Sequence, residues 1–180
     1  MPFSVIPLSL PEVILLEPTI FRDERGVFFE CYRESDVSRL GIREKFPQDN
    51  CSRSAKNVLR GLHYQSSPKA QGKLVRCSKG AIFDVCVDIR KNSPTFSQWL
   101  SAELTEDNCR LLYVPPGFAH GFVALTEGAE VLYKCTAEYS KEHDRGILWS
   151  DPAIGIRWPV QNPLLSEKDR RNPPLRDAQL

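Results

Sequence analysis

The chain has 180 residues, of which 41% are hydrophobic and 26% are charged. This length predicts a single globular domain over residues 1–180, because it allows a sizeable core but is short for two domains. The 24 basic and 23 acidic residues leave a formal net charge of +1. Such a balance provides no general attraction for nucleic acid or for an acidic membrane surface.

The sequence contains no apolar run that approaches the roughly 20 residues of a membrane-spanning helix. Its first segment, MPFSVIPLSLPEV, lacks the basic start and the continuous apolar centre of a signal peptide. We therefore expect a cytoplasmic protein with neither membrane nor nucleic acid as a partner.

Helices are expected in only two short segments, and strands nearly everywhere else. The first is SDVSRLGIREKF, where Ser35 or Asp36 could cap a helix, and the second is SEKDRR, where Ser166 could do so. Short β-branched or aromatic runs separated by turn residues predict the strands, which are KLVRCSKG, GAIFDVCVDIR, RLLYVPPGFAHGFVAL, AEVLYKCTAEYS and RGILWSDPAIGIRWP. This series predicts an all-β sandwich or barrel, with the closing NPPLRDAQL laid over its surface.

One strand has two chemically different faces. Residues that alternate along a strand point to opposite sides, which in GAIFDVCVDIR separates Val85, Val87 and Ile89 from Asp84, Cys86 and Asp88.

The six cysteines are scattered without a C-x-x-C pair, and several lie in apolar contexts. They are therefore predicted to be reduced thiols with mainly structural roles.

The segment NVLRGLHYQSSPKAQGKLVRC places Arg60, His63 and Lys73 close together in an otherwise strand-like stretch. They could be ordinary side chains on the exposed face of a sheet, or they could line a polar pocket for an anionic substrate. Strict alternation would direct Arg60 and His63 to opposite faces, unless a β-bulge intervenes.

A metal site is not favoured by the histidine pattern. Metal sites in small β-barrels usually show a His-x-His pair followed by further ligands, because the ion needs three or four converging donors. GLHYQ supplies one histidine, and only His120 and His143 remain. A metal-dependent enzyme would therefore need help from distant carboxylates.

Many ordered segments together resemble one family, dTDP-4-dehydrorhamnose 3,5-epimerase. They are FRDERGVFFE, FPQDN, NVLRGLHYQ, AQGKLVRCSKGAIFDVCVDIRKNSPTFSQW, YVPPGFAHGF, YKCTAEYS, ILWSDPAIGIRWP and LSEKD. The resemblance implies an all-β, cupin-type double-stranded β-helix (jelly roll) with a few short helices at its periphery and C-terminus. It also implies a homodimer that needs no cofactor or metal, and a substrate that is a 4-keto-6-deoxyhexose carried on dTDP.

The family removes and returns protons at C3 and C5, on either side of the C4 ketone. Such chemistry needs a base, a group that stabilises the enolate, and an acid on the other face. By resemblance, His63 is the base, Asp169 orients it, Lys73 faces the enolate and Tyr133 is the acid. Without the resemblance, Tyr133 would be read as a core aromatic, Lys73 as a solvated strand end and Asp169 as a helix cap.

The resemblance also implies a set of substrate-binding residues: Arg25, Glu30, Gln48, Asn50, Arg60, His120, Tyr139, Asp144 and Lys168. Arg60 is suited to phosphate because its planar guanidinium can form paired hydrogen bonds. Tyr139 lies where an aromatic ring can stack near the base. Asp144 departs from the family, in which the longer glutamate is common, and Arg25 in DERG also fits a plain charged turn.

Three alternatives remain open. A single-centre epimerase could retain both His63 and Tyr133, a metal-dependent cupin enzyme would share the barrel, and a non-catalytic sugar-binding jelly roll would share the pocket. If the chain dimerises as the family does, SVIPLSLPEVILLEP is expected to contribute to the interface.

Overall fold

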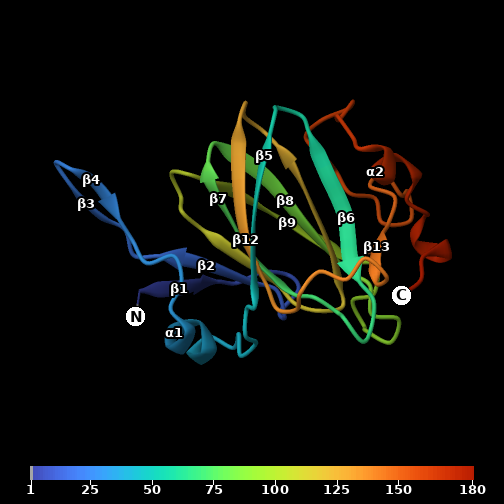
Figure 1. Ribbon diagram of the computed structural model, residues 1–180, viewed down its shortest axis with the longest axis horizontal. Coiled ribbons are helices and arrows are strands. Elements are labelled where there is room, and N and C mark those ends of the chain that lie inside the picture. Colours follow the sequence, from blue (N-terminus) through green and yellow to red (C-terminus); the bar gives the residue numbers. More distant parts are fainter. Residues whose placement is uncertain (1) are drawn as a thin grey trace.

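Two antiparallel sheets face each other in the computed structural model, which describes residues 2–180 (Figure 1). One sheet has the order β1 (Phe3–Ile6), β2 (Ile14–Pro18), β10 (Leu111–Val114), β7 (Lys73–Lys79), β12 (Ala129–Cys135) and β5 (Gln48–Ser54). The other has the order β13 (Asp144–Gly146), β6 (Leu59–Gln65), β11 (Phe118–Ala124), β8 (Ala81–Asp88) and β9 (Trp99–Thr105). Strands distant in sequence are neighbours in both sheets, as in the predicted jelly roll.

The remaining elements lie outside the two sheets. A hairpin of β3 (Phe21–Asp23) and β4 (Gly26–Phe28) projects from the body, and the short helix α1 (Glu34–Arg39) lies near the N-terminal strands (Figure 1). Helix α2 (Glu167–Arg171) and a 3₁₀ turn (Leu175–Asp177) lie beside β6 and β13. Within residues 2–180, every helix is too short and too polar to cross a membrane.

Strand β8 confirms the predicted separation of two faces. Cys86 belongs to the core cluster between the sheets, together with Val75 and Val131 of the opposite sheet. Val85 and Val87 belong to a second cluster on the outer face, which the C-terminal part of the chain covers. Both faces of β8 are therefore buried, and the face that carries the aspartates is the interior one.

Helix α1 covers the outer face of the six-stranded sheet, where Val37 packs with Leu74 and Leu111. The prediction that Ser35 or Asp36 caps this helix is wrong. The helix begins at Glu34 after Arg33, and no side chain caps its first turn. Packing of an apolar residue against the sheet, rather than a cap, holds this six-residue helix, since helices so short are marginal alone.

The segment RGILWSDPAIGIRWP, predicted to be a strand, contributes only Arg145 and Gly146 to β13. Turns replace the strand where Asp151 bonds the backbone of its own turn and that of the 3₁₀ turn near the C-terminus. Its two carboxylate oxygens accept hydrogen bonds from the backbone N–H of Ala153 at 2.9 Å and of Leu175 at 2.6 Å. An aspartate that bonds nearby backbone groups favours turns over a sheet ladder.

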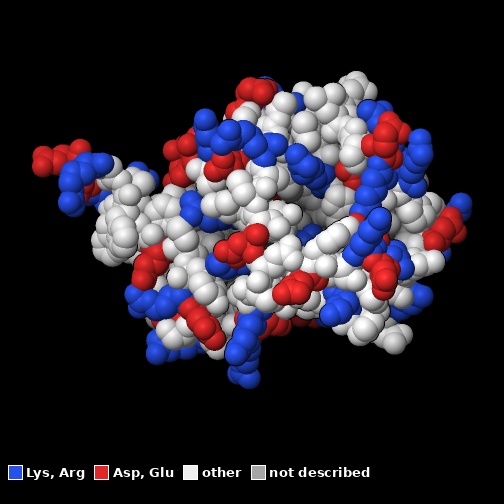
Figure 2. Space-filling view, viewed as in Figure 1, with Lys and Arg blue, Asp and Glu red and all other residues white. Residues whose placement is uncertain are grey.

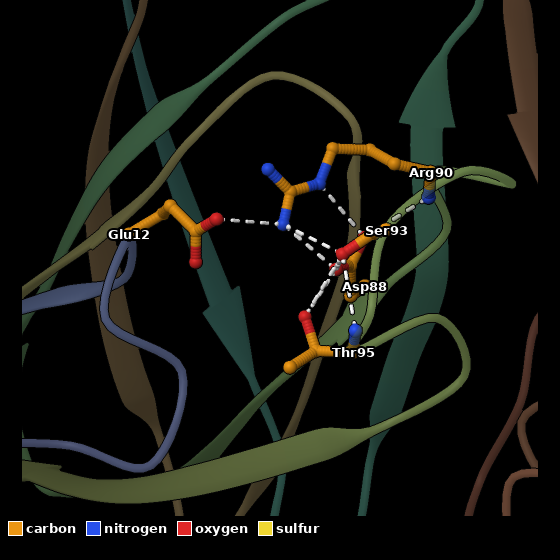
Figure 3. A network of polar contacts seen from close by, with 5 residues as sticks. All are labelled: Glu12, Asp88, Arg90, Ser93 and Thr95. Carbon is orange, nitrogen blue, oxygen red and sulfur yellow. Dashed lines mark hydrogen bonds and ion pairs between the residues drawn. The ribbon is translucent and has the colours of Figure 1, made fainter.

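A polar network fixes the connection between β8 and β9 to the N-terminal segment (Figure 3). The buried Asp88 carboxylate accepts hydrogen bonds from Arg90, Ser93 and Thr95, and the Arg90 guanidinium also reaches Glu12 at 3.0 Å. Burial opposes the charge of Asp88, but the three donors outweigh it and hold the Asp88 pKa well below its usual range. The network is therefore an ionised structural clamp.

Strand β6 carries an irregularity that decides where its side chains point. His63 pairs with His120 and Arg60 with Phe122, so three residue steps on β6 match two on β11. The extra residue is a β-bulge. It occurs at Gly61, whose φ is +124°. The Cα of Gly61 packs directly against the backbone of Gly121 on β11, with no room for a side chain between them.

We expect Gly61→Ala to destabilise the protein strongly. An added Cβ would lie 2.6 Å from the Cα of Gly121, and the residue would keep an unfavourable positive φ. The expected loss in the free energy of unfolding is about 3 kcal/mol, from overpacking and backbone strain together, measured by urea denaturation. Gly128→Ala is the control, because its φ is +66° but nothing lies within 4 Å of the added carbon; equal losses in both variants would contradict the close approach.

Candidate active site

Two adjoining cavities, of about 460 and 430 Å³, open between the sheets beside α2. Both are lined by His63, Lys73, Tyr133 and Lys168. The first is also lined by Ser52, Arg60, His120 and Asp169, and the second by Gln48, Asn50, Gln65, Gln71, Tyr139 and Asp144. All predicted site residues except Arg25 and Glu30 therefore line one continuous region.

His63 and Asp169 form a pair across the cavity wall. The Nε2 atom of His63 lies 2.5 Å from Oδ1 of Asp169, which is almost fully buried. The other carboxylate oxygen accepts a hydrogen bond from the Ser166 hydroxyl at 2.8 Å. Burial raises the pKa of Asp169, but the hydrogen bond and charge of His63 outweigh it, so the Asp169 pKa lies below its usual value. An ionised Asp169 is thus held against the imidazole.

The start of α2 sets the position of Asp169. Ser166 caps this helix, as predicted, by accepting a hydrogen bond from the Asp169 backbone N–H at 3.1 Å. The same hydroxyl donates to the Asp169 carboxylate. One serine therefore fixes both the backbone and the side chain of the residue that orients His63.

Lys73 and Tyr133 reach the cavity from neighbouring strands of the six-stranded sheet. Lys73 pairs with Cys135 of β12, two residues after Tyr133. Burial lowers the pKa of Lys73, opposed by nearby groups that include Asp84. Burial also raises the pKa of Tyr133, so its phenol stays protonated at neutral pH and can donate a proton.

His120 forms a second histidine–carboxylate pair, with Asp84. Its Nε2 lies 2.9 and 3.0 Å from the two carboxylate oxygens of Asp84, and both side chains are buried. Burial lowers the pKa of His120 despite the opposing charge of Asp84. Asp84 was not among the predicted site residues, although the alternation of β8 had already placed it on a distinct face.

Strand β5 supplies a row of polar side chains that the sequence only half revealed. Gln48 and Asn50 were predicted, but Ser52 also lines the first cavity and Ser54 accepts a hydrogen bond at 3.1 Å from Nε of Arg60. These four residues alternate along β5, so they share one face. The alternation in QDNCSRS was the signal that could have found both serines.

The bulge in β6 brings Arg60 and His63 to the same cavity. Strict alternation would have separated them. Arg60 also donates to the carbonyl of Arg53 at 3.3 Å, which leaves part of its guanidinium free to meet an anion. The short segment that raised the question of a polar pocket thus delivers Arg60, His63 and Lys73 to one place.

The second cavity contains a linked set of polar contacts. Asp144 forms an ion pair with Lys168 and accepts a hydrogen bond from the Tyr139 hydroxyl at 3.1 Å. Gln48 donates to Asn50 at 3.1 Å, and Asn50 donates to the Cys135 sulfur at 3.4 Å. All six cysteines are free thiols, as predicted.

Arg25 and Glu30 lie outside both cavities. Arg25 belongs to the β3–β4 turn, where it forms an exposed ion pair with Asp23 at 2.6 Å, and Glu30 forms an ion pair with Arg33. Figure 2 shows charges of both signs at the tip of this projecting hairpin. Within one chain, these two residues do not contribute to the site.

The residues between 2 and 180 contain no group of three or more His, Cys, Asp or Glu side chains placed to hold a metal ion. The cavity instead combines a histidine with an ionised carboxylate, a protonated tyrosine and a desolvated lysine. Together, the fold and the site define a jelly-roll protein equipped for general acid–base chemistry.

Comparison with known proteins identifies the family. Residues 7–177 match the sequence model of dTDP-4-dehydrorhamnose 3,5-epimerase. The protein of that name from Salmonella typhimurium is 55% identical over 178 residues, covering 98% of this chain and 97% of that protein. The chain belongs to the dTDP-4-dehydrorhamnose 3,5-epimerase family.

Solved structures agree with this assignment. A Legionella pneumophila dTDP-6-deoxy-D-glucose-3,5-epimerase in complex with dTDP-4-keto-L-rhamnose is 45% identical, with a TM-score of 0.94 over 97% of this chain and 94% of that chain. A Bacillus anthracis dTDP-4-dehydrorhamnose 3,5-epimerase with TDP and PPi bound is 48% identical, with a TM-score of 0.93 over 96% of this chain and 99% of that one. The cupin-type jelly roll expected from the sequence is therefore confirmed.

The buried His120 predicts a pH dependence of stability. Its folded pKa is lowered, so below about pH 6.5, the ordinary histidine value, the unfolded chain binds a proton that the folded protein does not. The free energy of unfolding should therefore fall as the pH drops below that value. Urea denaturation at several pH values between about 5 and 8 measures the fall, and His120→Gln should make it shallower; an unchanged slope in that variant would contradict a neutral buried His120.

Proposed function

We propose that this chain inverts C3 and C5 of dTDP-4-dehydro-6-deoxy-D-glucose to give dTDP-4-dehydro-L-rhamnose, in dTDP-L-rhamnose biosynthesis. The observation that carries the proposal is the convergence of the His63–Asp169 pair, Lys73 and Tyr133 on one cavity. These groups supply the base, the enolate partner and the acid that epimerisation beside a ketone requires. Family membership supports the same reaction.

In the proposed mechanism, His63 takes the proton from a carbon next to the C4 ketone. The electron pair of the broken C–H bond forms a C=C bond, and the C4 oxygen becomes an enolate. Asp169 stabilises the imidazolium, and Lys73 meets the negative oxygen. Tyr133 then donates its phenolic proton to the opposite face of the carbon, which inverts the centre. The imidazolium then releases its proton to solvent and the tyrosinate takes one up, so that both groups are reset before the second centre reacts.

His120 and Asp84 lie beside this machinery, in the same cavity wall. With its Nε2–H donated to Asp84, a neutral His120 presents Nδ1 as an acceptor for a sugar hydroxyl without adding another full charge next to Lys73. The charge of Lys73 helps to lower the pKa of His120, and the charge of Asp84 opposes the lowering of the pKa of Lys73. We propose that His120 contacts the sugar and that Asp84 holds it in place.

The nucleoside would occupy the second cavity, and its phosphates would extend to Arg60 in the first. Arg60 would bind phosphate oxygens, because its guanidinium suits them geometrically. Gln48, Asn50 and Lys168 offer hydrogen-bond partners for the remaining polar groups, and the exposed Tyr139 ring offers a stacking surface for the base. Asp144 would act through its contacts with Lys168 and Tyr139. No cofactor or metal enters this proposal.

His63→Ala should abolish deuterium incorporation at both C3 and C5 of the substrate in deuterated water, followed by proton NMR, because the base is lost. Tyr133→Phe should retain exchange but form little inverted product, because proton removal survives while the acid on the opposite face is lost. Each variant is expected to lower product formation by at least about 100-fold, the usual contribution of a positioned acid or base.

His143→Ala is the matched control, because His143 is the remaining histidine and does not line either cavity; it should retain kcat. Near-normal turnover in His63→Ala would overturn the assignment of the base. Exchange at one carbon alone in the unaltered protein would indicate a single-centre epimerase, and binding without exchange would favour a sugar-binding jelly roll. Activity that is lost with a chelator and restored with a metal would favour a metal-dependent cupin enzyme.

We also propose that the protein is a cytoplasmic homodimer and that a second copy supplies Arg25 and Glu30 to the site. The β3–β4 hairpin stands away from its own chain and exposes Phe21 and Phe28 to 60% and 66%. Such exposed aromatic rings suit a protein interface. The N-terminal segment contributes an edge strand, β1, whose Val5 is 44% exposed.

Light scattering after size-exclusion chromatography should give twice the chain mass of 20.5 kDa at micromolar concentration. Val5→Asp should shift the protein toward the monomer, because it places a charge in an apolar contact. A mass of one chain for the unaltered protein, or an unaffected dimer in Val5→Asp, would count against an interface at the N-terminal strand.

A further inference from the structure

The loop that follows β12 and carries Tyr139 is held by three glutamine side chains. Gln71 donates to the carbonyl of Ala137 at 2.6 Å. Gln65 donates to the carbonyl of Glu138 at 3.2 Å and accepts from the backbone N–H of Ser140 at 2.7 Å. Gln48 accepts from the backbone N–H of Tyr139, also at 2.7 Å. Four consecutive residues, 137–140, are thus anchored through their backbone.

The side chain of Tyr139, by contrast, is largely free. It is 58% exposed, and its hydroxyl donates to Asp144 at 3.1 Å. An exposed ring gains little orientation from packing, so its position depends on the backbone that carries it. Ordering this backbone in advance lowers the entropy cost of binding a planar group on the ring.

Gln65 and Gln71 are placed on the same strands and turns as the proton-transfer residues. Gln65 follows His63 by two residues on β6, and Gln71 precedes Lys73 by two residues. Gln65 is 6% exposed. The segments that carry the proposed base and the proposed enolate partner therefore also hold the backbone of the Tyr139 loop.

We infer that Gln65 and Gln71 are positioning residues for the nucleotide: they fix the 137–140 loop so that the Tyr139 ring is ready to stack on the base. This inference rests on the proposed function, because the base is the planar group. Neither glutamine is expected to touch the reacting carbons. Their effect should therefore appear in substrate affinity rather than in the chemical step.

Glutamine is suited to this role because its amide both donates and accepts. Gln65 uses its NH₂ group on the carbonyls of Lys69 and Glu138, and its oxygen on the N–H of Ser140. Glutamate has the same shape but, when ionised, only accepts. Gln65→Glu therefore keeps one contact and loses the other two, with a carboxylate left facing two carbonyl oxygens.

The test compares Gln65→Glu and Gln71→Glu with the unaltered protein. Both variants should raise KM for the dTDP sugar and Kd for dTDP roughly tenfold, in line with the energy of one base-stacking contact, while kcat stays near normal. Gln98→Glu is the matched control, because it introduces the same charge at a residue that is exposed and lies outside both cavities. It should change neither constant.

A double-mutant cycle with Tyr139→Ala distinguishes action through the loop from a direct effect. If the glutamines act through Tyr139, adding either variant to Tyr139→Ala should raise KM no further. A full tenfold increase in that background, a loss of kcat at unchanged KM, or unchanged affinity in the single variants would overturn the inference. If Gln65→Glu does not fold, Gln71→Glu, which removes a single contact, provides the same comparison.

Amide hydrogen exchange of residues 137–140 without ligand separates this inference from the proposed function. Protection should fall in both glutamate variants and persist in Gln98→Glu. An unaltered protein that neither binds dTDP nor exchanges substrate protons would refute the proposed function, whereas loss of loop protection would still be measurable. Unchanged protection in both variants would overturn the positioning role even if the enzyme is active.

Discussion

The close approach of β6 and β11 at Gly61 and Gly121 is the constraint on which the site depends. No side chain separates the two strands there, and the added residue on β6 forms a bulge. The bulge turns Arg60 and His63 to the same side, although strict alternation would oppose them. The proposed phosphate contact and the proposed base are therefore three residues apart on one strand, which requires a backbone position that only glycine fits well.

Around this strand, burial shifts the pKa values of most of the ionisable side chains in the site. Desolvation lowers the pKa of Lys73 and His120 and raises that of Tyr133. Asp169 is the exception, since its hydrogen bond with His63 outweighs burial and lowers its pKa. The cavity thus holds a histidine paired with an ionised carboxylate and a protonated tyrosine at the same pH, and these are the groups that the proposed proton removal on one face and return on the other would use.

The two adjoining cavities share structural supports. Ser166 fixes Asp169, and Ser54 contacts Arg60. The Tyr139 loop is held by glutamines that neighbour His63 and Lys73. Rigid strands carry these supporting residues, so the groups that meet a ligand are oriented before it arrives. Such ordering reduces the entropy cost of binding and alignment.

The sequence by itself determined the all-β class, the two faces of β8, the Ser166 cap and, through family resemblance, most residues of the cavity. Those features follow from local periodicity and ordered motifs, which a chain carries before it folds. Only the tertiary structure decided that Arg60 and His63 share a face, that Asp84 supports His120, and that Arg25 and Glu30 lie outside the cavity of their own chain. These outcomes depend on strand register and on contacts between distant segments, which local patterns do not specify.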